Sequence, residues 1–140
     1  MKICMLGAGY VGLVSGACFS DLGNIVVCAD VDKKKIDILN SGKIPIYEPG
    51  LNELVKKNFE QKRLSFTTDI SSSIKSSDII FICVGTPTKK NSNTANLKYI
   101  FQVAKVISLN INKYKVIVTK STIPVTTGDT IEKIIKKKIS

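Results

Sequence analysis

The sequence predicts an α/β fold in which helices cover both faces of a parallel sheet. Three observations predict it. Short apolar runs alternate with helical patterns along the 140 residues, as in doubly wound sheets. The run 79–84 is apolar throughout, which is typical of a strand buried on both faces. A glycine-rich turn, 7–12, joins the first predicted strand to the first predicted helix.

The first thirty residues carry this turn in a specific setting. An apolar run, 2–6, predicts a buried strand, and the turn that follows has the sequence GAGYVG and opens a helix. A second apolar run, 25–29, ends on Asp30. Strand, glycine turn, helix, second strand and terminal acid together form the dinucleotide-binding fingerprint.

Each residue of the fingerprint has a physical reason. Gly7 permits the tight turn, Gly9 lets the backbone approach a pyrophosphate, and Gly12 lets the helix pack closely on the strand. The first helical amides and the positive end of the helix dipole suit phosphate groups. Asp30 lies 18 residues after Gly12, where an acid meets ribose hydroxyls. The alternative is a glycine-rich turn between two core strands, with Asp30 as an ordinary polar residue at a strand end.

Apolar periodicity predicts the remaining elements. Gly23 ends the first helix, and Asp32 and Asp69 can cap two short helices. Further strands are expected at 64–67, 78–84 and 116–119. The inward faces expected for the successive helices are Val11, Val14, Cys18 and Leu22; Ile36 and Leu39; Leu51, Leu54, Val55 and Phe59; Ile70 and Ile74; Leu97, Ile100, Phe101, Ala104 and Ile107; and Ile131, Ile134, Ile135 and Ile139.

The winding of such a sheet determines where a ligand binds. The expected strand order is 3-2-1-4-5, so the carboxyl ends of strands one and four form a crevice where the winding reverses. A complete dinucleotide fold has a sixth strand, whereas this pattern ends in a helix after strand five, so a sixth strand is expected to be absent. Residues 1–140 are expected to form one dinucleotide-binding domain of the Rossmann type.

The loops that leave strands four and five are expected at this crevice. Strand four exits into a GTPT loop, where Gly85 permits close backbone approach, Thr86 can bond a ribose or phosphate, and Pro87 stiffens the turn. Strand five exits into a KSTIP loop, from which Thr122 would point into the crevice near a nicotinamide. The alternative for both loops is an ordinary turn, because Thr, Ser and Pro are common turn residues.

Charge and hydropathy exclude several classes of protein. The net charge of +10 comes almost entirely from lysine, since Arg63 is the only arginine among 21 basic residues. Proteins that bind nucleic acids usually show arginine, aromatic platforms or a recognisable motif, so no nucleic-acid partner is expected. No apolar run reaches the ~18 residues of a membrane span, and no signal-type segment opens the chain. A cytoplasmic protein without a membrane partner is therefore expected.

The cysteines predict no metal site. None of the four forms a C-x-x-C pair, and the chain has no histidine. Buried, reduced thiols are expected instead. The cysteines are Cys4, Cys18, Cys28 and Cys83.

Four segments resemble the amino-terminal domain of the UDP-glucose 6-dehydrogenases, in the wider UDP-glucose/GDP-mannose dehydrogenase family. They are GAGYVGL at 7–13, IPIYEPGL at 44–51, VGTPT at 84–88 and KSTIP at 120–124. Their order and spacing span essentially the whole chain. The YEPGL stretch and the two threonine loops are far more specific than the glycine motif. The PIYEPGL stretch favours UDP-glucose over GDP-mannose or UDP-N-acetylmannosamine as the substrate.

The resemblance implies NAD as the cofactor. It implies that the backbone amides of Tyr10 and Val11 bind the pyrophosphate. It also implies that Asp30 holds the adenosine ribose and that Lys35 lies beside that ribose.

Further roles follow from the same resemblance. Ser121 and Thr122 are implied near the nicotinamide, with Thr122 helping to position a catalytic water. The family reaction passes two hydrides from UDP-glucose to two NAD molecules and gives UDP-glucuronate through a cysteine thioester. The full-length enzyme is expected to be a homo-oligomer. The residues implied along the cofactor channel are Gly85, Thr86 and Pro87.

Two departures from the family pattern stand out. Thr126 occupies a position after Pro-Val where the family often has glycine. The family's nucleophilic cysteine and the residues that assist it belong to segments downstream of this domain, and no cysteine here matches them. The substrate and catalytic domain is therefore expected to be absent from this chain, and the chain alone is expected to be inactive.

Two other classes share parts of this pattern. A stand-alone nucleotide sensor, such as the ligand-gating domains of potassium transport systems, has a similar length, the glycine motif and the acid. Another NAD(P)-dependent dehydrogenase, such as a 3-hydroxyacid enzyme, has a similar amino-terminal domain. The YEPGL stretch and the threonine loops argue against both.

Overall fold

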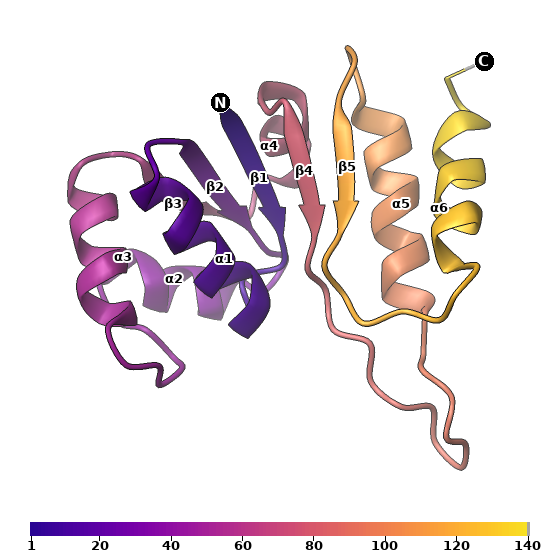
Figure 1. Cartoon of the computed structure of the whole chain (residues 1–140), viewed down its shortest axis with the longest axis horizontal. Helices are drawn as coiled ribbons and strands as arrows, with labels where there is room; N and C mark the ends of the chain where they lie inside the picture. Colours follow the sequence, from indigo (N-terminus) through magenta and orange to yellow (C-terminus); the bar gives the residue numbers. More distant parts are fainter. Residues whose placement is uncertain (140) are drawn as a thin grey trace.

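The computed structural model describes residues 1–139, in which helices cover both faces of one parallel sheet (Figure 1). All the elements expected from the sequence are present. The strands are β1 (Lys2–Leu6), β2 (Ile25–Ala29), β3 (Leu64–Thr67), β4 (Ile79–Ile82) and β5 (Val116–Thr119). The helices are α1 (Tyr10–Asp21), α2 (Lys33–Asn40), α3 (Leu51–Glu60), α4 (Ile70–Ser76), α5 (Lys98–Asn110) and α6 (Thr127–Lys136).

The sheet has the strand order β3-β2-β1-β4-β5 with every pair parallel, which confirms the predicted fold class. The central strand β1 pairs with β2 on one side and β4 on the other, so Cys4 lies opposite both Val27 and Ile80. The winding reverses between β1 and β4, and their carboxyl ends form the expected crevice. Within residues 1–139, no sixth strand pairs with β5.

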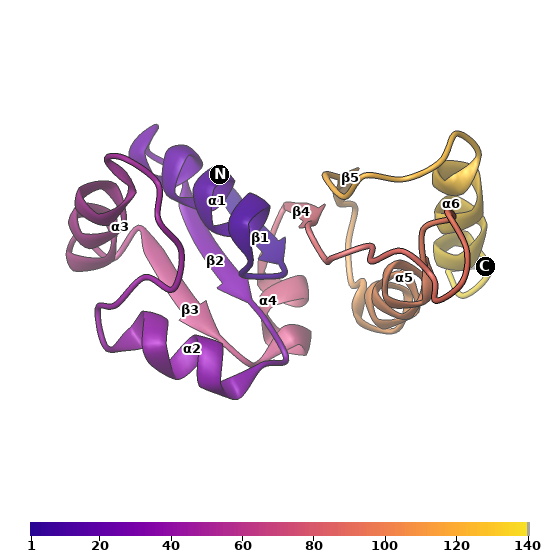
Figure 2. The same ribbon diagram turned by 90° about the horizontal axis from the view of Figure 1, so that it is seen from below.

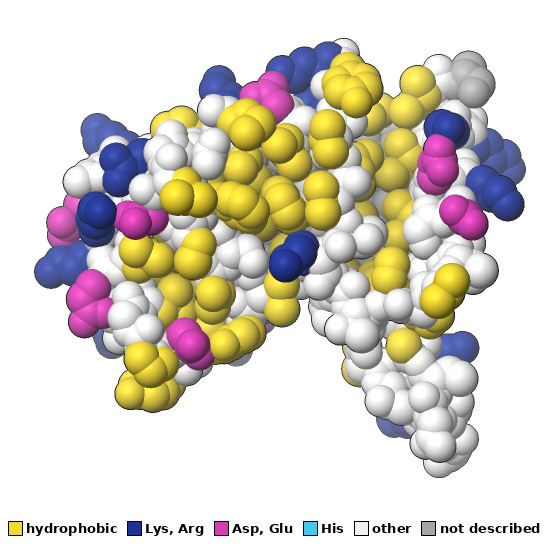
Figure 3. Space-filling model, in the orientation of Figure 1, with side chains coloured by type: hydrophobic (Ala, Val, Ile, Leu, Met, Phe, Trp, Pro, Cys, Tyr) yellow, Lys and Arg dark blue, Asp and Glu magenta, His cyan; other side chains and the backbone are white. Residues whose placement is uncertain are grey.

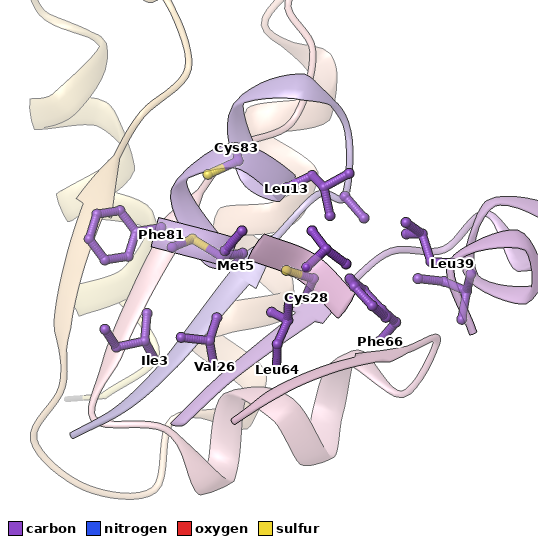
Figure 4. Close-up of a cluster of buried hydrophobic side chains, with 14 of the residues drawn as sticks. Ile3, Met5, Leu13, Val26, Cys28, Leu39, Leu64, Phe66, Phe81 and Cys83 are labelled. Carbon is purple, nitrogen blue, oxygen red and sulfur yellow. The ribbon is translucent and has the colours of Figure 1, made fainter. Parts of the chain in front are cut away.

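Each face of the sheet has its own core. Helices α1, α2 and α3 cover one face, and α4, α5 and α6 cover the other (Figures 1 and 2). Because side chains alternate along a strand, Ile3 and Met5 of β1 join the first core, whereas Cys4 and Leu6 join the second. Figure 4 shows the cluster on the α1 side.

Helix α1 packs against the sheet through small residues. An added Cβ on Gly16 would lie 2.8 Å from the Sγ atom of Cys28, and one on Gly12 would lie 1.9 Å from the carbonyl oxygen of Gly7. The close packing predicted at Gly12 is confirmed. The buried residues of α1 are Gly12, Leu13, Gly16, Ala17 and Ser20.

The inward face predicted for α1 is wrong. Leu22 is 78% exposed, Val11 and Cys18 are also exposed, and Val14 is only partly buried. Helix α1 carries apolar residues on nearly all sides, so periodicity alone does not select a face. The glycines select it, because only they let the helix backbone approach the sheet. Apolar side chains accordingly gather on the outer surface over α1 (Figure 3), and the expected burial of Cys18 fails for the same reason.

Two smaller corrections concern α3 and α6. Phe59 is 37% exposed, and Asn58 takes the buried position beside it. The Asn58 side chain is satisfied there, because its amide donates to Asp21 at 3.1 Å and its carbonyl accepts from Arg63. Ile139 lies beyond the end of α6 and is 57% exposed.

We expect Gly12→Ala to destabilise the domain, whereas Gly9→Ala leaves it folded. The new Cβ at residue 12 meets the backbone carbonyl of Gly7, so the free energy of unfolding should fall by about 3 kcal/mol. The same methyl at residue 9 meets no atom within 4 Å. Urea unfolding followed by circular dichroism measures both variants. Equal stability of the two would contradict the close packing of α1.

Candidate functional site

The crevice between the carboxyl ends of β1 and β4 begins with the glycine turn. Gly7 follows β1 with a φ of +110°, in a region that favours glycine. An added Cβ there would lie 2.8 Å from the carbonyl oxygen of Cys83, just beyond β4. The Gly7 amide donates to the Ala29 carbonyl at 2.8 Å. The turn is therefore held between the ends of β2 and β4.

The N-terminus of α1 leaves backbone amides without a side-chain cap. Gly9 is the N-cap residue, and no acidic residue lies in the first helical turn. An added Cβ on Gly9 would meet no atom within 4 Å, so the space around this glycine is open. The open space, the uncapped amides of Tyr10 and Val11 and the positive end of the helix dipole fit a pyrophosphate.

Asp30 connects the glycine turn to α2. Its Oδ2 atom accepts from the Ala8 amide at 2.8 Å and from Lys35 Nζ at 3.0 Å, and its Oδ1 atom accepts from the Asp32 amide at 2.9 Å. Partial burial alone would raise the pKa of Asp30, but the bonds from Ala8, Asp32 and Lys35 outweigh it and hold the pKa below its usual value. The carboxylate is therefore ionised at neutral pH.

This carboxylate has little acceptor capacity left. Two carboxylate oxygens offer about four lone-pair sites, and Ala8, Lys35 and Asp32 use three of them. One site on Oδ1 is available to a ribose hydroxyl. A second hydroxyl can bond only where Lys35 moves away from Oδ2.

A cavity of about 790 Å³ lies at this edge of the sheet. It brings together several residues that the sequence predicted, from three separate segments. These are Gly7, Gly9, Asp30, Lys35 and Gly85.

The other wall of the cavity contains residues that sequence reasoning missed. Tyr99 is 50% exposed and Val106 is 36% exposed on α5. Together with Gln102 and Val103 they follow the spacing i, i+3, i+4 and i+7, which defines a second stripe beside the core stripe of this helix. The spacing of Tyr99, Val103 and Val106 in this second stripe is the signal that could have identified them. Val31 and Ile70 also line the cavity.

Apart from Gly85, the predicted residues of the β4 and β5 exit loops do not line this cavity. The Thr86 hydroxyl donates to the Thr122 carbonyl at 3.1 Å, and the Ser121 hydroxyl donates to the Val84 carbonyl at 2.6 Å. These bonds tie the two loops together beside the crevice. Thr122 and Pro87 are both exposed.

The buried cysteines are not activated thiols. Burial raises the pKa of Cys4 to about 12 and that of Cys83 to about 11, and it raises the pKa of Cys28 as well. Because the thiolate is the nucleophile, these side chains are unreactive at neutral pH. In the part of the chain that the structure describes, no group of three or more His, Cys, Asp or Glu side chains could hold a metal ion. No helix there is long and apolar enough to cross a membrane.

The fold and this site define a dinucleotide-binding domain of the doubly wound class. The family model that describes the NAD-binding domain of the UDP-glucose/GDP-mannose dehydrogenases matches residues 1–140. The chain belongs to this family, and its cofactor is NAD.

Several relatives are similar over nearly the whole chain. The UDP-glucose 6-dehydrogenase of Rhizobium meliloti (strain 1021) is 51% identical over 98% of this chain and 31% of its own length. The UDP-glucose 6-dehydrogenase TuaD of Bacillus subtilis (strain 168) is 55% identical over 97% of this chain and 29% of its own. A ternary complex of the GDP-mannose dehydrogenase of Pseudomonas aeruginosa superposes with a TM-score of 0.92 at 40% identity, over 99% of this chain and 32% of that one. The chain therefore spans about a third of the length of these relatives.

We expect Asp30→Asn to lower the free energy of unfolding by about 1–3 kcal/mol at pH 7, because two amides and Lys35 lose a charged acceptor. The folded-state pKa of Asp30 is depressed, so its stabilisation is present above the unfolded pKa and is lost as the pH falls through the folded value. The difference between parent and variant should therefore shrink below about pH 4. Urea unfolding at several pH values measures this difference.

The matched control is Asp37→Asn. Asp37 pairs with Lys33 on the surface, where both side chains are more than half exposed, so its loss should cost less than about 0.5 kcal/mol. A cost for Asp30→Asn that is equally small, or that stays constant down to pH 2, would contradict the assigned role of this carboxylate.

Proposed function

We propose that this chain is the NAD-binding domain of a UDP-glucose 6-dehydrogenase. One observation carries the proposal: the open glycine turn and the ionised Asp30 border one cavity, in a chain that also contains the PIYEPGL stretch. The substrate is supported by the relatives from Rhizobium meliloti and Bacillus subtilis, both of which are UDP-glucose 6-dehydrogenases. In the cytoplasm, such an enzyme would supply UDP-glucuronate for polysaccharide synthesis.

The cofactor is proposed to lie along the crevice. Its pyrophosphate would accept hydrogen bonds from the amides of Tyr10 and Val11, with Gly7, Gly9 and Gly12 shaping the turn. Its adenosine would enter the cavity beside α5, where apolar side chains and one ring can contact a base.

The remaining contacts are proposed for the ribose and the nicotinamide. Asp30 would accept from a ribose hydroxyl, with Lys35 beside it. Thr122 would help to place a catalytic water near the nicotinamide. The other residues proposed along the channel are Gly85, Thr86, Pro87 and Ser121.

The chemistry of the whole protein is a four-electron oxidation. Bound NAD supplies the hydride acceptor, and one UDP-glucose, two NAD and one water would give UDP-glucuronate and two NADH. Residues of this chain would bind and orient the cofactor. The nucleophilic cysteine would come from a region beyond this domain, because Cys4, Cys28 and Cys83 are buried with raised pKa values and the exposed Cys18 does not line the cavity. The full-length protein is proposed to act as a homo-oligomer.

A related sugar nucleotide is the second candidate substrate. The GDP-mannose dehydrogenase structure superposes with a TM-score of 0.92, and a UDP-glucose dehydrogenase from Pyrobaculum islandicum superposes with a TM-score of 0.91. A UDP-N-acetyl-mannosamine dehydrogenase from Staphylococcus aureus follows at 0.88. The backbone of this domain is therefore shared by enzymes with different sugar substrates, and assays of the full-length protein with all three sugar nucleotides separate these candidates.

We expect the chain to bind NAD about tenfold or more tightly than NADP. Asp30 repels a 2′-phosphate, and the nearby amines of Lys33 and Lys35 are already paired with Asp37 and Asp30. Asp30→Ala should weaken NAD binding and reduce the difference in affinity between NAD and NADP. Isothermal titration calorimetry measures both affinities, and tighter binding of NADP would contradict the assignment.

The position of the cofactor is tested by Gly9→Val. This side chain meets no protein atom near its Cβ, so the domain should stay folded while NAD binding is lost. Gly128→Val is the matched control, because it also enters open space and lies on α6. Parent-like NAD binding by Gly9→Val would place the cofactor elsewhere.

We expect no dehydrogenase activity from these 140 residues alone. Hydride transfer requires the sugar to be held against the nicotinamide, and the relatives are about three times longer than this chain. The measurement is NADH formation from UDP-glucose by the purified chain, with the Bacillus subtilis relative as the positive control. Turnover that survives replacement of all four cysteines would contradict the proposal that the reaction requires a nucleophilic cysteine from beyond this domain.

A further inference from the structure

The PIYEPGL stretch does not line the cavity, although it is among the most specific motifs in the sequence. It belongs to the loop that joins α2 to α3 (Figure 2). A hydrogen bond connects this loop to α1, because the Tyr10 hydroxyl donates to Oε2 of Glu48 at 2.8 Å. The two residues are 38 positions apart, and Tyr10 is the first residue of the helix after the glycine turn.

The loop provides a rigid support for Glu48. The Leu51 amide donates to the Glu48 carbonyl at 3.1 Å, and Gly50 has a φ of +81° and a ψ of −8°. With Pro49 at the second position, these four residues have the features of a type II turn. Ile46 packs against the core before the turn, and Leu51 is 4% exposed after it. The backbone of Glu48 is therefore held on both sides.

The first turn of α1 gains a tether from this bond. Gly9 supplies no side-chain cap, and the ring of Tyr10 is 53% exposed, so neither a cap nor burial of this ring restrains the side of the turn that carries Tyr10. The Glu48 carboxylate raises the pKa of the Tyr10 phenol above its ordinary value. The phenol is protonated at neutral pH, as an ordinary tyrosine is, and is the donor in this bond.

We propose that Glu48 is a positioning residue for cofactor binding. It holds Tyr10 and thereby keeps the first amides of α1 in the arrangement that receives a pyrophosphate. A turn that is already ordered costs less entropy to bind than one that must be ordered by the ligand. The inference rests on the proposed function and assigns the YEPGL motif a part in the same site.

The test compares ligands that contain the pyrophosphate with one that lacks it. NAD, ADP and adenosine are titrated against the parent, Tyr10→Phe, Glu48→Ala, Glu48→Gln and the double variant Tyr10→Phe/Glu48→Ala, with NMR detection. Tyr10→Phe and Glu48→Ala each remove the bond. We expect each of them to weaken the binding of NAD and ADP by about three- to tenfold and to leave the binding of adenosine unchanged. The double variant should be no weaker than Glu48→Ala, because both changes remove one interaction.

The conservative variant and a control complete the design. Glutamine keeps an acceptor for the phenol, so Glu48→Gln should bind NAD within about twofold of the parent. Glu53→Ala removes an exposed carboxylate from the first turn of α3 and should bind like the parent. Parent-like or tighter ADP binding by Glu48→Ala overturns the inference, and so does an equal loss of ADP and adenosine. A parent that binds neither NAD nor ADP overturns the proposed function and this inference with it, whereas unaffected variants of a binding parent overturn this inference alone.

Discussion

The short distance between α1 and the sheet is the constraint on which the rest of the structure depends. Neither Gly12 nor Gly16 has room for a Cβ, because the Gly7 carbonyl and the Cys28 thiol occupy that space. A helix kept further away by side chains would carry its first amides away from the ends of β1 and β4. The Ala8 amide, in the turn that leads into α1, is bonded to Asp30 just after β2, which holds the start of the helix beside the sheet. The close packing of α1 on the sheet therefore also sets the position of its first amides.

The sequence predicts the sheet and its order because alternating apolar runs restrict the topology to very few arrangements. It does not predict which side of α1 is buried. Leu13 and Leu22 have the same side chain, yet Leu13 is fully buried and Leu22 is 78% exposed. The difference comes from the two glycines, which bring one side of the helix onto the sheet. Hydrophobic periodicity measures the character of side chains and not the distance to the neighbouring layer.

The candidate site likewise contains residues that the sequence predicts and residues that it does not. Gly7, Gly9 and Asp30 are predictable because local backbone geometry and spacing define their chemistry. Tyr99 and Gln102 are not, because they become part of a wall only when α5 is placed opposite the end of β2. The sequence predicts the position of Asp30 at the end of the second strand. It does not predict the hydrogen bonds that Asp30 accepts from Ala8, Asp32 and Lys35. They orient the carboxylate, and in the proposed complex Lys35 would compete with a ribose hydroxyl for Oδ2.

Thr126 shows how the fold accommodates a departure from the family pattern. Its φ of +58° and ψ of −12° lie in the left-handed region, where a β-branched residue costs about 1–2 kcal/mol more than glycine. The position precedes α6, which is anchored by Thr127 at 4% exposure and by Ile131 in the second core. Because these anchors fix the start of α6, the chain between β5 and α6 follows its path in spite of the strain. The bond from Thr86 to the Thr122 carbonyl is made in the same loop, so the strain at Thr126 leaves the connection between the two threonine loops in place.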